Sequence, residues 1–163
     1  MSDQILTIRT KPYLIRFLET TYGPQPIKFP KSNFNDIILY YVDFPPLDYK
    51  VPDYGDETLK IEIPYCEFKN IKSYNYLNPE RQDFFNDEIY MFFRLTYRKE
   101  ISKLLMMQSN KKDPVRKKKA IEMFMEKYNI SMDSWDMLDQ DYKRHIKLTW
   151  KTHRLRLNRN MSV

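Results

Sequence analysis

The spacing of apolar and polar positions predicts two strands and a short helix in the first part of the chain. Ile5 to Ile8 is a short strand candidate, and Leu59 to Ile63 alternates with the period of two that is typical of a half-buried strand. Pro64 indicates that this second strand ends there or lies at a sheet edge. Between the strands, Pro12 to about Tyr22 has the one-sided apolar spacing of a helix, which Gly23-Pro24 should end.

Two segments that follow are less regular. Asn35 to Phe44 is apolar and aromatic, and fits either a short helix or a strand. Pro45 to Gly55 is rich in proline and reads as a connection made of turns. Cys66, the single cysteine, is expected to be a small apolar filler in a strand.

From Asn78 onward the pattern becomes helical. Asn78 is a favourable N-cap, Pro79 suits the first helical position, and the helix can run to about Gln108. The centre of this helix is apolar nearly all round, which predicts a central buried helix. Its apolar residues are Ile89, Tyr90, Met91, Phe92, Phe93, Leu95 and Tyr97.

Two further helices are expected. Asp113-Pro114 should start the first, whose apolar positions Ile121, Phe124, Met125 and Tyr128 follow helical spacing. The second begins near Asp133, with an inward stripe of Trp135, Leu138, Tyr142, Ile146, Thr149 and Trp150. The fold class is therefore α+β, with a small β-containing part at 1–77 and a three-helix module at 78–163.

Composition excludes several classes of function. The chain has only two glycines, whereas phosphate-cradling loops need several closely spaced ones, so nucleoside triphosphatase and dinucleotide-binding folds are excluded. One cysteine permits neither an internal disulfide nor a cysteine zinc cluster. Met1 to Thr10 lacks the pattern of a signal peptide, and the longest apolar run, Ile89 to Phe93, is too short to span a membrane. We expect a cytoplasmic protein with no membrane partner.

Charge is distributed unevenly. Residues 1–77 carry a net charge of −1 and residues 78–163 a net charge of +7, against +6 for the whole chain. Lys111 to Lys119 contains six cations and one acid, and Tyr142 to Val163 contains seven cations and no acid. Trp150, His145 and His153 lie among the second set, as rings do on nucleic-acid surfaces.

These stretches predict polyanion binding, because counterions released by many phosphate contacts supply most of the affinity. An ordinary solvated helix face is the alternative interpretation of a charge run. The candidate nucleic-acid-binding residues are Lys111, Lys112, Arg116, Lys117, Lys118, Lys119, Lys143, Arg144, Lys147, Lys151, Arg154, Arg156 and Arg159.

The segment from Ile121 to Leu138 carries a motif. Phe124 and Tyr128 would lie on one helix, Asn129-Ile130 would form the turn, and Trp135 and Leu138 would lie on the next helix. Asn suits such a turn because it tolerates the left-handed backbone region. This stretch, within residues 120–142, resembles the helix-turn-helix of bacterial and phage DNA-binding proteins. The resemblance implies DNA binding by the second helix.

The second helix of this motif departs from the pattern in its acids. Four carboxylates on it would repel phosphate rather than meet it: Asp133, Asp136, Asp139 and Asp141. The cations lie on the continuation of the same helix, Lys143 to Arg159. Acids near the start of a helix and bases toward its end also complement the helix macrodipole, which is a purely structural explanation.

The residue pattern gives little support to catalysis. His145 and His153 are eight residues apart on a basic helix with no nearby carboxylate, which implies neither a metal site nor an oriented base. Asp139 and Asp141 should point to different helix faces, so they do not suggest a magnesium site. No enzymatic activity, cofactor or metal is expected.

The sequence therefore predicts a non-enzymatic DNA-binding protein, with DNA favoured over RNA. A regulator or genome-maintenance factor of a phage or mobile element fits the small size, the Lys/Asn/Tyr-rich composition and the motif resemblance. The alternative is a structural or assembly protein, such as a virion component, whose basic C-terminal helix grips a partner or packaged nucleic acid. A homodimer or a protein assembly partner is compatible with either interpretation.

Overall fold

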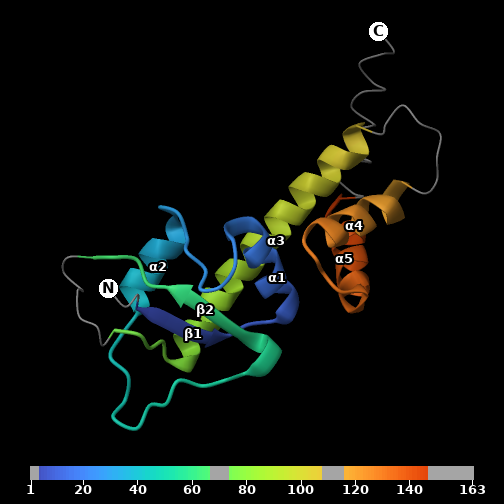
Figure 1. The fold of residues 1–163 in the computed structure, drawn as a ribbon. Coiled ribbons are helices and arrows are strands. Elements are labelled where there is room, and N and C mark those ends of the chain that lie inside the picture. Colours follow the sequence, from blue (N-terminus) through green and yellow to red (C-terminus); the bar gives the residue numbers. More distant parts are fainter. Residues whose placement is uncertain (1–3, 67–73, 108–115, 147–163) are drawn as a thin grey trace. The chain divides into compact units, whose positions relative to one another are not determined.

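The computed structural model describes residues 4–66, 74–107 and 116–146. Over these residues the chain forms a two-stranded sheet and five α-helices, so the predicted mixture of α and β structure is confirmed (Figure 1). The chain divides into two compact units, Met1–Met91 and Phe92–Val163. They are called here the N-terminal unit and the C-terminal unit, and each is described by itself.

The sheet of the N-terminal unit contains both predicted strands. Strand β1 (Ile5–Arg9) pairs antiparallel with β2 (Thr58–Glu62), with Thr7 opposite Lys60. The alternation seen in the sequence has its expected effect, because the apolar side chains of β2 are fully buried and its lysine is exposed. The strand ends at Glu62, two residues before Pro64, as predicted.

The other edge of β2 is partly covered by the backbone of Ile27. The backbone N–H of Ile27 donates a hydrogen bond to the Lys60 carbonyl at 2.8 Å. The Glu62 N–H in turn donates to the Ile27 carbonyl at 2.9 Å, which makes a parallel bridge between Ile27 and Ile61. The Ile27 side chain is fully buried, so the same residue closes part of the sheet edge and contributes to the core.

Two short helices pack into this unit. Helix α1 (Pro12–Tyr22) has the predicted bounds, and Gly23 follows it with a φ of 104°, a conformation that favours glycine. Helix α2 (Asn33–Tyr41) settles the ambiguous segment as a helix. Three rings join α2 to the long helix α3 (Pro79–Met107): Phe34 lies 4.8 Å from Phe29 and 5.9 Å from Phe85, measured between ring centroids.

Helix α3 (Pro79–Met107) begins as the sequence predicts. The Asn78 side-chain oxygen accepts a hydrogen bond from the Arg81 N–H at 2.8 Å, which is the geometry of an N-cap. The division between the two units falls within α3, later than the expected boundary between residues 77 and 78. The reason is that the first turns of α3 belong to the N-terminal core through Phe85 and Ile89.

The expectation that α3 is buried all round is wrong. Met91 is 46 % exposed and Leu95 is 59 % exposed, although both are apolar. The buried residues instead form one stripe with a spacing of four, which is the one-sided pattern of an amphipathic helix. This stripe consists of Ile89, Phe93, Tyr97 and Ile101.

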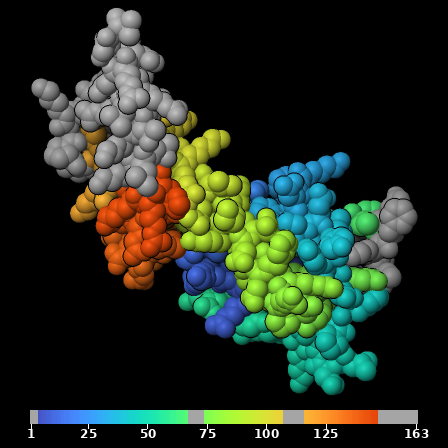
Figure 2. All heavy atoms as spheres, turned by 180° about the vertical axis from the view of Figure 1, so that it is seen from behind, coloured from blue at the N-terminus to red at the C-terminus, as the bar shows by residue number. Residues whose placement is uncertain are grey.

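Within its described residues, 92–107 and 116–146, the C-terminal unit contains the last part of α3 and two further helices. Helix α4 (Arg116–Lys127) buries its apolar positions Ile121, Phe124 and Met125, and α5 (Trp135–Asp141) buries Leu138 while Trp135 is half-buried. A 3-10 turn, η3 (Met132–Ser134), precedes α5, and a π-helical turn, η4 (Tyr142–Ile146), follows it. In Figure 2, α5 and η4 (red) lie against the last part of α3 (yellow-green).

The turn between α4 and α5 has the geometry that the sequence suggested. Asn129 has a φ of 52°, in the left-handed region that asparagine tolerates. The Ile130 N–H donates to the Met125 carbonyl at 2.8 Å, and the Asn129 N–H donates to the Glu126 carbonyl at 3.2 Å. This pair of bonds is a Schellman motif, which satisfies carbonyls that the end of a helix leaves open.

Of two predictions about single segments, one is wrong and the other concerns residues that the structure does not describe. Cys66 is half-buried but lies beyond the end of β2, so its expected place in a strand is wrong. The Asp113-Pro114 helix start lies outside the described residues, as do Thr149 and Trp150. Of the helices that the structure describes, α3 included, none has the length and apolarity needed to cross a membrane.

Candidate nucleic-acid interface

The candidate interface is basic overall. The C-terminal unit has 18 lysines and arginines and 8 aspartates and glutamates, a net charge of +10, while the N-terminal unit has a net charge of −4. Six of the thirteen predicted binding residues are described, four in α4 and two in η4: Arg116, Lys117, Lys118, Lys119, Lys143 and Arg144. The others lie outside the described residues: Lys111, Lys112, Lys147, Lys151, Arg154, Arg156 and Arg159.

Asp139 brings the two basic segments together. Its carboxylate is 2.5 Å from the Lys117 ammonium of α4 and 2.7 Å from the Lys143 ammonium of η4. Hydrogen bonds from Lys117 and then from Lys143 hold the pKa of Asp139 below its usual value. Although the stretch from Tyr142 to Val163 contains no acid of its own, the charges of Lys143 and Lys117 are screened, because folding places the Asp139 carboxylate between them.

The remaining described cations are more accessible. Lys118 and Lys119 are exposed on α4, and Lys118 is 3.7 Å from Glu122 one turn along the helix. Arg144 is exposed in η4. Exposure makes the Lys119 ammonium and the Arg144 guanidinium accessible to a phosphate. Arg116, at the start of α4, is half-buried.

Asp141 is the centre of a second ion-pair network, which joins α5 to α3. Its carboxylate accepts hydrogen bonds from Arg94 at 2.8 and 3.1 Å and from Arg98 at two distances of 2.8 Å. Burial raises the pKa of Asp141, but the bonds from Arg98 and Arg94 outweigh this effect and lower it overall. Beside the network, the Tyr97 hydroxyl donates to the Leu138 carbonyl at 2.9 Å.

A third contact ties α4 to the same part of α3. The Glu100 carboxylate accepts hydrogen bonds from the Lys127 ammonium at 2.7 Å and from the Tyr128 hydroxyl at 2.6 Å. Both α4 and α5 are thus fastened to α3 by charged side chains as well as by the apolar core. This arrangement holds the hairpin and its cations in one defined geometry.

The four carboxylates between Asp133 and Asp141 do not all repel phosphate. Asp139 and Asp141 point to different helix faces, as predicted, and each is held by basic side chains. The expectation that four carboxylates repel phosphate is wrong for these two, because their charge is already balanced. Asp133 and Asp136 are exposed, so the repulsion applies to them.

The expectation that His145 has no nearby carboxylate is also wrong. Its Nε2 atom is 3.8 Å from an Asp141 oxygen and 3.2 Å from the Arg94 guanidinium. Because Asp141 precedes it by four residues, helical spacing alone could have revealed the pair. His153 lies outside the described residues. Within the described ranges, no group of three or more His, Cys, Asp or Glu side chains is arranged to hold a metal ion.

Sequence reasoning missed the residues that organise this surface. Arg94 and Arg98 are four apart on α3, a spacing that places both on one helix face, but their acidic partner is more than 40 residues away in the chain. Local signals, at a spacing of four residues, existed for Asp139 with Lys143 and for Asp141 with His145. No family model, curated protein or solved structure matches this chain.

Proposed function

We propose that this chain is a non-enzymatic nucleic-acid-binding protein, with DNA favoured over RNA, and that the C-terminal unit carries the binding surface. The observation behind the proposal is the division of charge, with +10 on the C-terminal unit and −4 on the N-terminal unit. A polyanion is attracted by the field of one unit and repelled by that of the other. The chain therefore has one unit suited to phosphate, although its overall net charge is only +6.

Within the C-terminal unit, the described cations fall into two roles. Lys119 and Arg144 are exposed and suited to direct phosphate contact, together with Lys118. Lys117 and Lys143 are held by Asp139, so they join α4 to η4 and contribute less to phosphate binding. Phosphate contacts position a protein on a duplex without reading its sequence. We therefore expect this surface to anchor the protein on DNA rather than to select a DNA sequence.

The hairpin of α4 and α5 supports DNA as the target, because its Schellman turn and its buried Phe124 and Leu138 are compatible with helix-turn-helix geometry. The start of the second helix exposes Asp133 and Asp136, which suit base edges poorly except for cytosine amino groups. Any sequence preference should then come from groove shape or from half-site spacing in a dimer. We infer a role in gene regulation or genome maintenance, in a phage or mobile element.

Salt-dependent binding to duplex DNA tests the proposal. Raising the salt concentration from 50 to 200 mM should weaken binding by about 10³-fold if six or more phosphates are contacted. The double variant Lys119→Glu/Arg144→Glu should reduce the slope of log affinity against log salt by about two units, since each contact releases about one counterion. Fluorescence anisotropy with a labelled duplex measures both quantities.

The matched control is Lys31→Glu/Lys50→Glu, which changes the net charge by the same amount at exposed lysines of the N-terminal unit. It should leave the salt slope nearly unchanged. A flat salt response of the unmodified protein contradicts the proposal, as does an equal loss in both double variants. A single-stranded RNA of equal length, run in parallel, separates the two nucleic acids.

An assembly or interaction protein is the second candidate, favoured by an exposed aromatic cluster on the N-terminal unit. Tyr40 is 77 % exposed and lies 4.8 Å from Tyr41, whose ring is 5.4 Å from that of Phe84, measured between centroids. Aromatic side chains are enriched at protein interfaces. Sedimentation of the Tyr40→Ser/Phe84→Ser variant tests this function. Loss of an assembly with unchanged DNA binding would support it over the DNA-binding proposal.

A further inference from the structure

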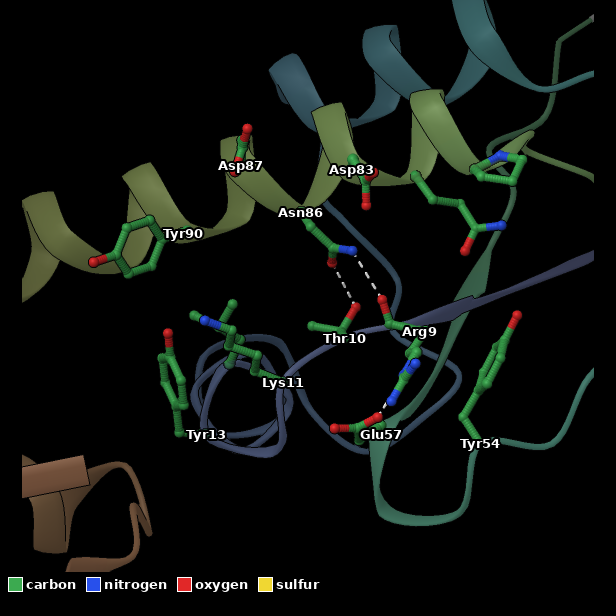
Figure 3. A pocket seen from close by; sticks show the side chains of 13 residues that line it. Arg9, Thr10, Lys11, Tyr13, Tyr54, Glu57, Asp83, Asn86, Asp87 and Tyr90 are labelled. Carbon is green, nitrogen blue, oxygen red and sulfur yellow. Dashed lines mark hydrogen bonds and ion pairs between the residues drawn. The ribbon is translucent and has the colours of Figure 1, made fainter. Parts of the chain in front are cut away.

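A pocket of about 810 Å³ is lined by residues of the N-terminal unit, and none of these residues belongs to the candidate nucleic-acid interface. It opens between the first half of α3 and the opposite wall made by the end of β1, the start of α1 and the 3-10 turn η1 (Gly55–Glu57), as Figure 3 shows. Its volume falls within the range of about 300 to 1,000 Å³ that is usual for small-molecule sites.

The base of this pocket is fixed by side-chain hydrogen bonds. The Thr10 hydroxyl donates to the Asn86 side-chain oxygen at 2.7 Å, and the Asn86 amide donates to the Arg9 carbonyl at 2.8 Å (Figure 3). The Arg9 guanidinium pairs with the Glu57 carboxylate at 2.5 Å. These bonds link α3, β1 and η1, so the pocket is formed before any ligand arrives.

Three tyrosines line the two ends of the pocket. Tyr13 and Tyr90 lie at one end and Tyr54 lies at the other (Figure 3). Burial, with a smaller effect of Tyr90, raises the pKa of Tyr13 to about 12, so its phenol is neutral near pH 7. Neutral phenol rings offer negative faces to a cation and apolar surface to an alkyl chain.

The charges that line the pocket favour a cation. Because Arg9 and Glu57 neutralise each other, the remaining charged groups are Lys11 on one wall and Asp83 and Asp87 on α3. The Asp83 carboxylate points from α3 into the pocket (Figure 3), and Asp87 follows one turn later on the helix. The net charge of −4 on the N-terminal unit adds to this negative potential.

We propose that this pocket binds a small organic cation of the guanidinium or primary-amine class. The Asp83 carboxylate binds the cationic head, in the paired geometry that carboxylates form with guanidinium groups. Tyr54 packs a ring face against the cation or its alkyl chain. Tyr13 and Tyr90 enclose the other end of the ligand. The site is independent of the proposed nucleic-acid binding, which uses residues of the other unit.

Calorimetric titration of the full-length chain with agmatine, a guanidinium compound with an amine at its other end, tests the site. Glutarate, a dianion of similar length, is titrated under the same conditions. Agmatine should bind with one-to-one stoichiometry and glutarate should not bind. Asp83→Asn should weaken agmatine binding about tenfold or more, the effect of losing a hydrogen bond to a charged partner. Tyr54→Ala should weaken it about two- to fivefold.

The matched control is Glu80→Gln, which removes one exposed carboxylate from the first turn of α3 and does not line the pocket. It should keep agmatine affinity within about threefold, since an exposed charge that does not line the pocket is weakened by water and salt. Three results overturn the proposal: no agmatine binding, glutarate binding as tight as agmatine binding, or an equal loss in Glu80→Gln and Asp83→Asn. Circular dichroism of each variant confirms that the fold is kept.

Discussion

In the N-terminal unit the ion pairs lie at the surface, whereas in the C-terminal unit the strongest ones lie between helices. The Arg9 and Glu57 side chains that pair are 66 % and 38 % exposed, but Asp141 is only 12 % exposed between Arg94 and Arg98. Exposed pairs add little to stability, and partly buried ones become costly to break. The comparison indicates that the N-terminal unit depends on its apolar core, while the C-terminal unit also depends on charge.

Helix α3 is acidic in its N-terminal part and basic in its C-terminal part, so it reflects the difference in net charge between the two units. Its part in the N-terminal unit carries Glu80, Asp83, Asp87 and Glu88 with one arginine, and its part in the C-terminal unit carries four cations with one acid. Acids near the start of a helix and bases near its end both interact favourably with the helix macrodipole. The division of charge between the units is thus also favourable for the helix that belongs to both.

The largest expected effect is the loss of an aromatic side chain from the C-terminal core. Phe124 lies 5.0 Å from Tyr97 and 4.7 Å from Tyr128, between ring centroids, and is 1 % exposed. Phe124→Ala should lower the free energy of unfolding by about 3 to 5 kcal/mol. Both tryptophans of the chain belong to the C-terminal unit, so urea unfolding followed by tryptophan fluorescence reports on this unit.

Met123→Ala is the control, because Met123 is the neighbouring residue of α4 and is 39 % exposed. Its expected cost is within about 0.5 kcal/mol, as for most surface changes. Equal costs for the two variants would contradict the core assignment. If circular dichroism shifts less than fluorescence in Phe124→Ala, the two units unfold separately.

A smaller effect is expected from Asp141→Asn, which removes the charge that both arginines bind. The change should cost about 2 kcal/mol, less than for a fully buried pair because the arginines reach solvent. Arg9→Ala, which breaks the exposed pair of the N-terminal unit, should cost less than about 1 kcal/mol. Similar costs for both variants, measured by urea unfolding, would remove the distinction between the units.

The lowered pKa of Asp141 also predicts a pH dependence of stability. The pKa of Asp141 is lowered in the folded chain, so the charged form contributes stability above the unfolded value of about 4. That contribution is lost as the pH falls from about 4 through the lower folded pKa. The stability difference between the unmodified protein and Asp141→Asn should therefore shrink below about pH 4. A constant difference between pH 7 and pH 3 would contradict the assignment.

Two helix ends, one in each unit, should both be destabilised by alanine. Asn129 has a φ of 52° and Gly23 has a φ of 104°, both in the region that disfavours ordinary side chains. Asn129→Ala should cost about 1 kcal/mol, while Asn129→Gly should cost nothing or stabilise slightly. Gly23→Ala should cost about 1 to 3 kcal/mol, because the φ of 104° and ψ of 178° at Gly23 lie in a region that only glycine readily adopts. Apart from its neighbours along the chain, the methyl group of an alanine at position 23 would have no atom within 4 Å, so the cost there reflects backbone strain rather than a clash with another part of the fold. Thermal unfolding measures all three.

The smallest effect is expected when the carboxylate of Asp139 is neutralised. This prediction rests on the proposed nucleic-acid binding. Asp139→Asn releases Lys117 and Lys143 and raises the net charge of the C-terminal unit by one. Duplex DNA should bind several-fold more tightly, with a salt slope steeper by about one unit. The cost in stability should stay below about 1 kcal/mol because the side chain of Lys143 is 59 % exposed and that of Lys117 is 36 % exposed. Weaker DNA binding at unchanged stability would mean that the bridge itself shapes the binding surface.

The parts of the fold that local chemistry determines could be predicted from the sequence. Asn78 before Pro79 marks the start of α3, Gly23 marks the end of α1, and Asn129 marks the turn after α4. Each of these residues has a backbone or capping preference that operates within a few residues. The alternation of apolar and polar residues predicted β2 for the same reason, because strand geometry fixes which side chains share a face.

Features that depend on distant partners could not be predicted. The exposure of Met91 and Leu95 follows from which face of α3 is covered, and an apolar run does not contain that information. The partners of Asp141 come from a helix more than 40 residues earlier, and Lys117 meets Asp139 only after the hairpin forms. The pocket of the N-terminal unit combines β1, α1, η1 and α3, so no single segment signals it.

The backbone bridge of Ile27 to β2 has a consequence for aggregation. A two-stranded sheet presents edges whose free N–H and C=O groups can recruit a strand from another copy of the chain. At the β2 edge, the Lys60 carbonyl and the Glu62 N–H are already bonded to Ile27. An incoming strand would first have to displace a residue whose side chain is fully buried, so intermolecular pairing at this edge requires partial unfolding. Insertions that loosen the segment before Ile27 would therefore promote self-association without altering either strand.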